Sequence, residues 1–297
     1  MNNKIELNSV PKILRVVFIY SMFTLMPLFS AAFNIYGQSS GKSLRVMTFN
    51  IRYGAADDGQ DSWQYRKNNT IATVKAFDPD IFGLQEALQF QIDEFTKQMP
   101  DYTCVGVGRD DGKQAGEHSC IFFSTKRFAI DSTQTFWFSD TPTIPGSKSW
   151  GNNITRICTW ALLTDKNSSK SFYVFNVHLD HESQPSREKS AELLVKRISE
   201  KKLPVILTGD FNSGDDNPAI KTVLASGLID TYRKLHPKQN DEGTYHAFKG
   251  NTDGEKIDFI FTSKDFDVKK SGIVHKSYNG HYPSDHFPVT SVISFSK

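Results

Sequence analysis

The stretch PVILTGDFN, residues 204–212, is almost continuously apolar up to Gly209 and then becomes polar. This composition is typical of a strand inside a sheet that is covered on both faces, because every side chain then meets a packed layer. The stretch therefore predicts a buried central strand, with Asp210 and Asn212 placed where the strand ends.

Short apolar runs of the same kind recur on both sides of this strand, separated by turn residues. The predicted strands cover residues 44–49, 81–84, 103–107, 119–124, 133–138, 157–163, 172–177, 205–208, 257–261 and 289–295. Helical spacing of apolar residues occurs at 63–77, at 88–98 and most clearly at 186–200, and a shorter helix would begin at Asn217. Strands with interspersed helices predict an α/β fold in which two packed sheets are covered by helices.

The N-terminal residues have the three-part layout of a secretory signal. Three basic residues precede an apolar stretch over residues 16–35, and small residues lie near its end. We expect a signal peptide over residues 1–38 and an exported protein, periplasmic or secreted, without a membrane span after cleavage. The alternative is an uncleaved anchor, because the stretch is long enough to cross a bilayer. Residues 42–297 then form one domain with a sizeable core.

The charge balance argues against a protein that binds long nucleic acids. The chain has 35 basic and 33 acidic residues, of which three basic and one acidic lie in residues 1–38, so that 32 of each remain. A nucleic-acid-binding protein usually carries a basic face, because neutralised phosphates supply most of its affinity. Zero net charge lowers the expectation of a nuclease and leaves room for a local basic patch.

The cysteines match neither a metal site nor a disulfide framework. Cys104, Cys120 and Cys158 lie within apolar runs, and their number is odd. Free cysteine is among the most buried residue types, so we expect buried thiols. One pair would still be able to oxidise after export.

The polar residues of interest share one placement, at or just past the end of an apolar strand. Taken singly they have ordinary explanations: Asn50 would satisfy a strand-end backbone group, and Asp210 with Asn212 would form a turn. Asp258 is harder to explain in this way, because a buried carboxylate without a partner is unfavourable. Together they predict one cleft into which rigid strands aim their side chains. The set comprises Asn50, Glu86, Asn176, His178, Asp210, Asn212, Asp258, Asp285 and His286.

Seven motifs carry a resemblance to a known family. They are MTFNIR (47–52), GLQE (83–86), GEHSCIFFS (116–124), NVHLD (176–180), GDFN (209–212), KIDFIF (256–261) and SDHFPV (284–289). In order and spacing the chain resembles the endonuclease/exonuclease/phosphatase superfamily over essentially all of residues 44–296, and DSWQYRK with GTYHAF is similar to exported bacterial members. The resemblance implies a deoxyribonuclease-like four-layer α/β sandwich, with two facing mixed β-sheets flanked by helices and the active site at the top of the sheets.

The resemblance implies a metal and a water-activating group. Glu86 would be the principal ligand of Mg²⁺, with Asn50 and Asp285 on the same metal-binding side and Mn²⁺ as the alternative ion. Carboxylates together with waters suit a hard cation of this kind. Asp210 would orient and deprotonate the attacking water, and Asn212 would hold that water or a phosphate oxygen. Such a mechanism rests on positioning and electrostatics, without a covalent nucleophile.

The resemblance also implies two histidines at the phosphate. His286 would contact the phosphate and be oriented by Asp258, since an Asp–His pair favours the imidazolium. His178 would do similar work from the other side. Its partner would be Glu117, because GEHSCIFF resembles the deoxyribonuclease pattern in which a glutamate orients the second histidine.

Arg156 and Asn176 are the predicted substrate-binding residues. The family often has a phosphate-contacting arginine where Arg156 lies, and the alternative is a solvated charge at a strand edge. Trp63, Arg66, Trp150 and residues 243–248 would lie at the substrate rim, although the i, i+3 spacing of Trp63 and Arg66 is equally what plain packing requires.

These observations favour a metal-dependent phosphomono- or phosphodiesterase that acts outside the cytoplasm on a small-molecule or lipid-derived phosphate ester, as a monomer. An extracellular DNase-like endonuclease is the first alternative; the Glu117–His178 pair supports it and the zero net charge opposes it. A non-catalytic binding protein on the same fold is the second, and the intact set of catalytic residues argues against it.

Overall fold

The computed structural model describes residues 43–296. One sheet consists of β1 (Ser43–Asn50), β2 (Ile81–Ala87), β3 (Tyr102–Val105), β4 (His118–Ser124), β11 (Phe266–Ile273) and β12 (Val289–Phe295). The other consists of β5 (Phe128–Trp137), β6 (Ile157–Asp165), β7 (Ser171–His178), β8 (Val205–Asp210), β9 (Ile229–Asp230) and β10 (Asp258–Thr262). The helices are α1 (Trp63–Phe77), α2 (Gln89–Gln98), α3 (Gln184–Ser199) and α4 (Pro218–Ala225), with a short 3₁₀ helix, η1 (Gly59–Asp61), before α1.

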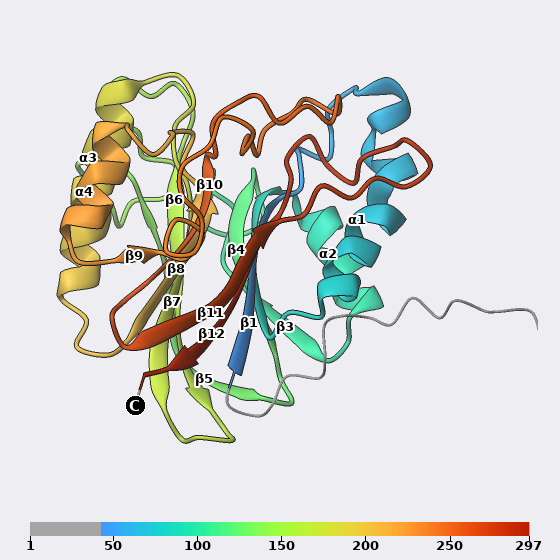
Figure 1. The fold of residues 1–297 in the computed structure, drawn as a ribbon. Coiled ribbons are helices and arrows are strands. Elements are labelled where there is room, and N and C mark those ends of the chain that lie inside the picture. Colours follow the sequence, from blue (N-terminus) through green and yellow to red (C-terminus); the bar gives the residue numbers. More distant parts are fainter. Residues whose placement is uncertain (1–42, 297) are drawn as a thin grey trace, which may run out of the picture. The chain divides into compact units, whose positions relative to one another are not determined.

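The two sheets face each other, and the helices lie on their outer surfaces (Figure 1). The strand orders are β11–β12–β1–β2–β4–β3 and β5–β6–β7–β8–β10–β9. β1 with β2 and β7 with β8 pair in parallel, and the other described pairs are antiparallel. The predicted α/β fold, a four-layer sandwich of two mixed sheets flanked by helices, is therefore confirmed.

Three apolar clusters correspond to the three interfaces between the four layers. The central cluster joins the two sheets and includes Val46, Val174 and Ile206. A second cluster packs α1 and α2 against the first sheet, and a third packs α3 and α4 against the second. β8 is buried at every position, as the PVILTG stretch predicts. Because both sheets are held on two faces, their strand ends are fixed relative to each other.

The strands that the sequence missed lie at or near sheet edges. β11 carries the exposed charged residues Asp267, Lys269 and Lys270 and has one buried residue, Phe266, and β9 has only two residues. β5 begins at Phe128 rather than at residue 133, because the middle of this edge strand carries exposed polar side chains. Edge strands keep one side open to water, so they lack the continuous apolar signal of interior strands.

The predicted signal peptide over residues 1–38 lies outside the described residues, and export therefore stays a prediction. Within residues 43–296, no helix is long and apolar enough to cross a membrane. The three cysteines are free thiols; Cys120 and Cys158 are buried and Cys104 is partly buried.

Candidate active site

Three neighbouring strands of the second sheet bring the central side chains together. β7 ends at His178, β8 ends at Asp210, and β10 begins at Asp258. The strand register pairs Asp210 with His178 on one side and with Asp258 on the other. Residues that pair directly across strands share one face of a sheet. The three side chains therefore form a row along one edge of the sandwich.

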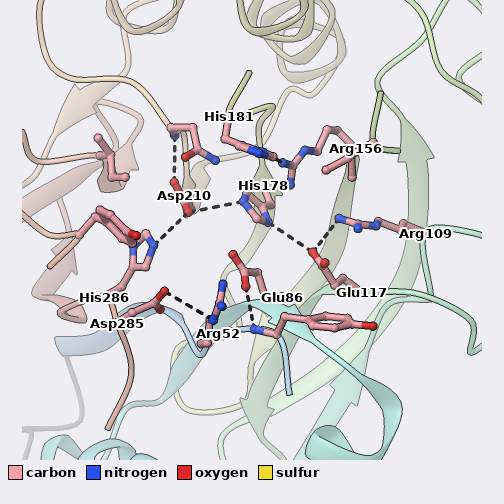
Figure 2. Close-up of a pocket in the computed structure, with 15 residues that line it drawn as sticks. Arg52, Glu86, Arg109, Glu117, Arg156, His178, His181, Asp210, Asp285 and His286 are labelled. Atoms are coloured by element: carbon pink, nitrogen blue, oxygen red, sulfur yellow. Dashed lines mark hydrogen bonds and ion pairs between the residues drawn. The ribbon is translucent and has the colours of Figure 1, made fainter. Parts of the chain in front are cut away.

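The first sheet contributes to the same edge, where β1 ends at Asn50 and β2 carries Glu86. A pocket of about 480 Å³ opens between these groups (Figure 2). Its lining residues are Arg52, Tyr53, Glu86, Arg109, Glu117, Ile154, Arg156, His178, His181, Asp210, Asn212, Tyr245, Ile257, Asp285 and His286. The size is that of a small-molecule site.

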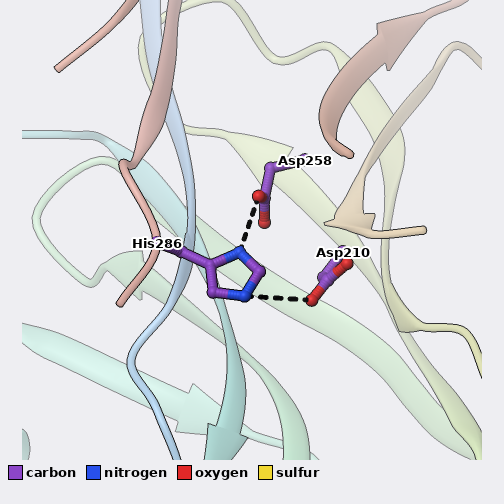
Figure 3. Close-up of side chains that lie close together, drawn as sticks. All are labelled: Asp210, Asp258 and His286. Atoms are coloured by element: carbon purple, nitrogen blue, oxygen red, sulfur yellow. Dashed lines mark hydrogen bonds and ion pairs between the residues drawn. The ribbon is translucent and has the colours of Figure 1, made fainter. Parts of the chain in front are cut away.

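His286 is held by a buried carboxylate. Its Nδ1 lies 2.9 Å from Asp258 Oδ2, and Asp258 is fully buried behind it (Figure 3). Burial alone would lower the pKa of His286, but the charges of Asp258 and Asp210 outweigh it and raise the pKa to about 10. His286 is therefore an imidazolium at neutral pH, as the Asp–His pair predicted.

Asp210 lies at the centre of the row, between the two histidines. Its Oδ2 accepts a hydrogen bond from Asn50 Nδ2 at 2.9 Å, and its Oδ1 accepts one from the backbone N–H of Asn212 at 2.9 Å. The same Oδ2 is 3.5 Å from His178 Nε2 and 3.8 Å from His286 Nε2. Burial, followed by the charge of Asp258, raises the pKa of Asp210 to about 7. A carboxylate with such a pKa suits general base catalysis near neutral pH.

His178 differs from the expectation. Glu117 Oε2 lies 3.9 Å from His178 Nδ1, but it accepts a hydrogen bond from Arg109 Nη1 at 2.6 Å. Burial, together with the positive charges of Arg156 and Arg109, lowers the pKa of His178 well below its ordinary value. Burial raises the pKa of Glu117 to about 7, and Arg109 opposes this shift. The predicted pair is thus loose, and His178 is neutral.

Glu86, Asn50 and Asp285 lie on the other side of Asp210. Asn50 Nδ2 donates to Glu86 Oε1 at 3.0 Å, and the backbone N–H of Tyr53 donates to Glu86 Oε2 at 2.7 Å. Glu86 has a φ of 59°, a left-handed conformation that costs a residue with a side chain about 1–3 kcal/mol. Its neighbours therefore hold this carboxylate in a conformation that the isolated chain would avoid.

The donor set on this side fits a hard divalent cation. Burial raises the pKa of Asp285, and the nearby charge of Glu86 raises it further, while His286 opposes the shift. A cation between the two carboxylates would relieve their repulsion, and oxygen ligands are those that Mg²⁺ prefers. Asn50 Oδ1 already accepts a hydrogen bond from the backbone N–H of Arg52 at 3.0 Å, so Asn50 acts at least in part by orienting Glu86.

A second cluster also has the composition of a metal site, since ligand atoms of Asp210, Asp258 and His286 lie within 4.8 Å of one another. In this cluster His286 Nδ1 already contacts Asp258 Oδ2 at 2.9 Å, and Asp210 Oδ2 accepts a hydrogen bond from Asn50 Nδ2. We therefore propose hydrogen bonding and proton transfer for this cluster and a metal site on the Glu86–Asp285 side.

Arg156 lines the pocket and is buried, so it is not a solvated charge at a strand edge. Its Nε lies 3.4 Å from Asp180 Oδ2, and its Nη2 lies 2.7 Å from His181 Nδ1. Asn212 also lines the pocket, and its Nδ2 donates to the carbonyl of Leu179 at 3.0 Å. Both remain placed for contact with a substrate.

Two expectations need correction. Asn176 is fully buried between the sheets, where its Nδ2 donates to the carbonyls of Leu84 and Cys120 and its Oδ1 accepts from Gln85. Asn176 and His178 lie on the same face of β7, but Asn176 is two residues farther from the end of the strand, roughly 7 Å from the edge of the sheet. Its side chain therefore bonds the two sheets to each other and cannot reach a substrate in the pocket.

The other correction concerns Arg66 and Trp63, which are buried and do not line the pocket. Arg66 Nη1 donates to the carbonyls of Ile51 at 2.7 Å and of Pro283 at 3.1 Å. It therefore ties together the two segments that carry Arg52 and Asp285, which is a structural role rather than a place at the rim.

Tyr245 lies in the predicted rim segment 243–248, whereas sequence reasoning assigned no role to six other pocket residues: Arg52, Tyr53, Arg109, Ile154, His181 and Ile257. Arg52 closes the MTFNIR motif and lies 3.8 Å from Asp285, while it also pairs with Asp58 at 2.8 Å. His181 follows the NVHLD motif directly, so its position offered a signal. Arg109 lies in a loop rich in glycine and charged residues, where no periodicity indicates which side chains point inward.

The family model described as Endonuclease/Exonuclease/phosphatase family matches residues 47–286. The chain belongs to this family, and the resemblance of its motifs is confirmed. The family description covers endonucleases, exonucleases and phosphatases, and the family is generally dependent on divalent metals.

Solved structures and curated relatives agree with this assignment. An endonuclease/exonuclease/phosphatase family protein from Bacteroides thetaiotaomicron is 36% identical, with a TM-score of 0.81 over 86% of this chain and 99% of that chain. The mannosyl-6-phosphatase of the same organism is also 36% identical, with a TM-score of 0.80 over 85% of this chain and 100% of that chain. Mouse Nocturnin is 25% identical over 302 aligned positions, which cover 87% of this chain. The chain spans 60% of the length of a mimivirus relative and 67% of mouse Nocturnin.

Proposed function

We propose that this protein is a metal-dependent phosphoesterase that hydrolyses a small-molecule phosphomonoester by direct attack of water. The observation that carries the proposal is the position of Asp210, which lies between a charged and a neutral histidine inside a pocket of about 480 Å³. The likeness to a mannosyl-6-phosphatase at 36% identity supports a monoester. The pocket lining has only two aliphatic side chains, Ile154 and Ile257, which disfavours a lipid-derived substrate.

Asp210 acts as the general base. With a pKa of about 7, it is ionised in a large fraction of molecules at neutral pH and still basic enough to take a proton from water. The water oxygen forms a bond to phosphorus while the bond from phosphorus to the ester oxygen breaks. Asn212, next to Asp210, holds the water or a phosphate oxygen.

His286 acts as a charge clamp and a proton donor. Its imidazolium binds a phosphate oxygen, offsets growing negative charge, and supplies a proton to the departing oxygen. Asp258 keeps this imidazole charged and fixes its orientation through the 2.9 Å contact. His178 is neutral and contributes a hydrogen bond rather than a charge. Arg156 lines the His178 end of the pocket and offers hydrogen-bond donors there.

Glu86 and Asp285 hold Mg²⁺, or Mn²⁺ as the alternative, with Asn50 orienting Glu86. When bound, the ion neutralises phosphate charge and the charge that develops on the leaving oxygen.

The proposal is tested by hydrolysis assays on the purified chain lacking residues 1–38, with Mg²⁺, Mn²⁺ or EDTA. The substrates are phenyl phosphate, hexose and inositol phosphates, bis-p-nitrophenyl phosphate, sphingomyelin and supercoiled plasmid. We expect turnover of phosphomonoesters that EDTA abolishes and that Asp210→Asn abolishes with either metal. Cleavage of plasmid alone would replace the proposal by the nuclease alternative. Absence of turnover with every substrate and metal would favour the binding-protein alternative.

The DNase-like alternative is weaker than the sequence suggested. Its support was the Glu117–His178 pair, and these groups are 3.9 Å apart while Glu117 bonds Arg109. Export and a monomeric state stay predictions. N-terminal sequencing of the protein from fractionated cells and light scattering of the purified chain would test them.

A further inference from the structure

The charged and polar side chains across the pocket form a row whose two ends differ in their residues. Asp258 and His286 form one end, and from Asp210 the row continues through His178 to Glu117 and Arg109. The proposed chemistry uses Asp210, both histidines and the metal side. Arg109 and Glu117 lie beyond the reacting groups, at the His178 end, and they still line the pocket.

At the His178 end of the pocket, both arginines are already paired with carboxylates. Arg109 Nη1 contacts Glu117 at 2.6 Å, and Arg156 Nε contacts Asp180 at 3.4 Å. A site for a second phosphate or for a nucleic-acid backbone needs unpaired positive charge. Guanidinium groups that each face a carboxylate instead offer directional hydrogen bonds without a strong net charge.

Both donors and acceptors at this end have hydrogen-bonding capacity left. Glu117 Oε1 accepts no hydrogen bond from residues 43–296, and only one of the guanidinium nitrogens of Arg109 donates to a side chain there. His181 Nδ1 faces Arg156 Nη2 at 2.7 Å. The guanidinium can only donate, so Nδ1 accepts and the half-exposed imidazole carries its proton on Nε2.

An aromatic side chain completes the pocket. Tyr245 lines it at the His286 end, across from Arg109 and Glu117; it is 49% exposed, and its ring centroid lies 5.1 Å from that of His286. Small-molecule sites combine such aromatic surfaces with a few placed polar groups. A ring that carries hydroxyl groups on its edge and C–H groups on its faces matches this combination.

We propose that Arg109, Glu117 and His181 form a hydroxyl-recognition subsite, and that the substrate is therefore the phosphomonoester of a sugar or another cyclic polyol. The proposal rests on the phosphoesterase function proposed above. Glu117 accepts from substrate hydroxyls, Arg109 and His181 donate to them, and Arg156 orients His181. In this account the main task of Glu117 is specificity, and its effect on His178 is secondary.

The test compares kcat/KM for mannose 6-phosphate and glucose 6-phosphate with kcat/KM for phenyl phosphate, whose ring has no hydroxyl groups. The variants are Glu117→Gln, Arg109→Gln and His181→Ala. His181 is half-exposed, so its replacement is the least disturbing to folding. Glu242→Gln and Arg233→Gln are matched controls, because Arg233 contacts Glu242 at the same 2.6 Å and neither residue lines the pocket.

We expect each subsite variant to lose at least tenfold more activity on the better hexose phosphate than on phenyl phosphate, which corresponds to roughly 1.4 kcal/mol. The control variants should shift this ratio less than twofold. Equal losses on both substrates in all three variants would overturn the subsite, because the residues would then act on the reaction itself.

The two proposals fail in different ways. Wild-type protein that hydrolyses phenyl phosphate but neither hexose phosphate nor inositol phosphate would remove the polyol subsite and leave the phosphoesterase standing. Wild-type protein that cleaves plasmid and no phosphomonoester would remove the proposed function itself.

Discussion

Two histidines lie near the same oxygen of Asp210, and their surroundings make one an imidazolium and leave the other neutral. His286 Nδ1 contacts Asp258 at 2.9 Å, and no arginine contacts Asp258 within residues 43–296. His178 lies 3.9 Å from a carboxylate that Arg109 holds at 2.6 Å. The two carboxylate–histidine pairs look equivalent in the sequence, but a carboxylate raises the pKa of a histidine only when no stronger cation engages it.

Because the two histidines differ in charge, we propose different roles for them in the pocket. In the proposed mechanism, His286 would bring positive charge to the phosphate on the side where Asp210 and the proposed metal ligands lie. His178 brings a hydrogen bond without charge, and beyond it the Arg109–Glu117 pair is free to contact another part of the substrate.

The largest effect is expected from removing the charged histidine. His286→Ala should lower kcat by about 10³-fold, because a preorganised charge at the phosphate is lost. His178→Ala should lower it by about tenfold to 10²-fold, since only a hydrogen bond is lost. Both values come from steady-state kinetics on one phosphomonoester with Mg²⁺. Equal losses would contradict the proposed division.

Asp258→Asn should lower kcat by about 10²-fold and move the alkaline limb of the pH–rate profile. In the wild type, the pKa of His286 is about 10, so the imidazolium persists until the pH rises through that value. Without the carboxylate the pKa falls, and activity is lost at lower pH. A profile of log kcat from pH 6 to pH 10 measures the shift. An unmoved alkaline limb would show that His286 is not the titrating group.

The acid limb belongs to Asp210. Its pKa is raised to about 7, and the carboxylate must be ionised to act as the base. Metal-free protein should therefore bind one proton per molecule at this site as the pH falls through about 7. In the same protein Asp210→Asn should remove that step. Potentiometric difference titration of the two proteins measures it, and identical curves would contradict the assignment.

The smallest effect on the reaction itself is expected for Glu117. Glu117→Gln should lower kcat for phenyl phosphate less than tenfold, because His178 is already neutral and does not depend on a carboxylate 3.9 Å away. Asp258→Asn, the equivalent change on the other side of Asp210, serves as the comparison. A loss for Glu117→Gln as large as that of Asp258→Asn would restore the symmetric pair that the sequence suggested.

The sequence predicts well which strand ends form this site, because these strands are buried. Interior strands such as β8 are continuously apolar, and their ends place Asp210, His178 and Asp258 at one edge by strand register. The polar edge strand β11 has no such signal and was missed.

Side-chain partners are harder to predict than strand ends. Asn176 and His178 share one face of β7, and only their depth decides that one joins the sheets and the other reaches the pocket. Arg109 comes from an irregular loop, where it contacts Glu117, and after burial and Arg156 its charge lowers the pKa of His178 further. No periodic pattern in the sequence predicts a long-range contact that a loop residue makes.

The difference between His286 and His178 is observed directly in the protonation states of the two imidazoles in metal-free protein. Their ring ¹⁵N shifts, assigned with His178→Ala and His286→Ala, would be followed by NMR from pH 6 to pH 9. We predict that His286 is an imidazolium and His178 a neutral imidazole throughout this range, because Asp258 raises the first pKa while burial and the two arginines lower the second. Two imidazoles that are both charged at pH 6 and lose their protons together would contradict the account.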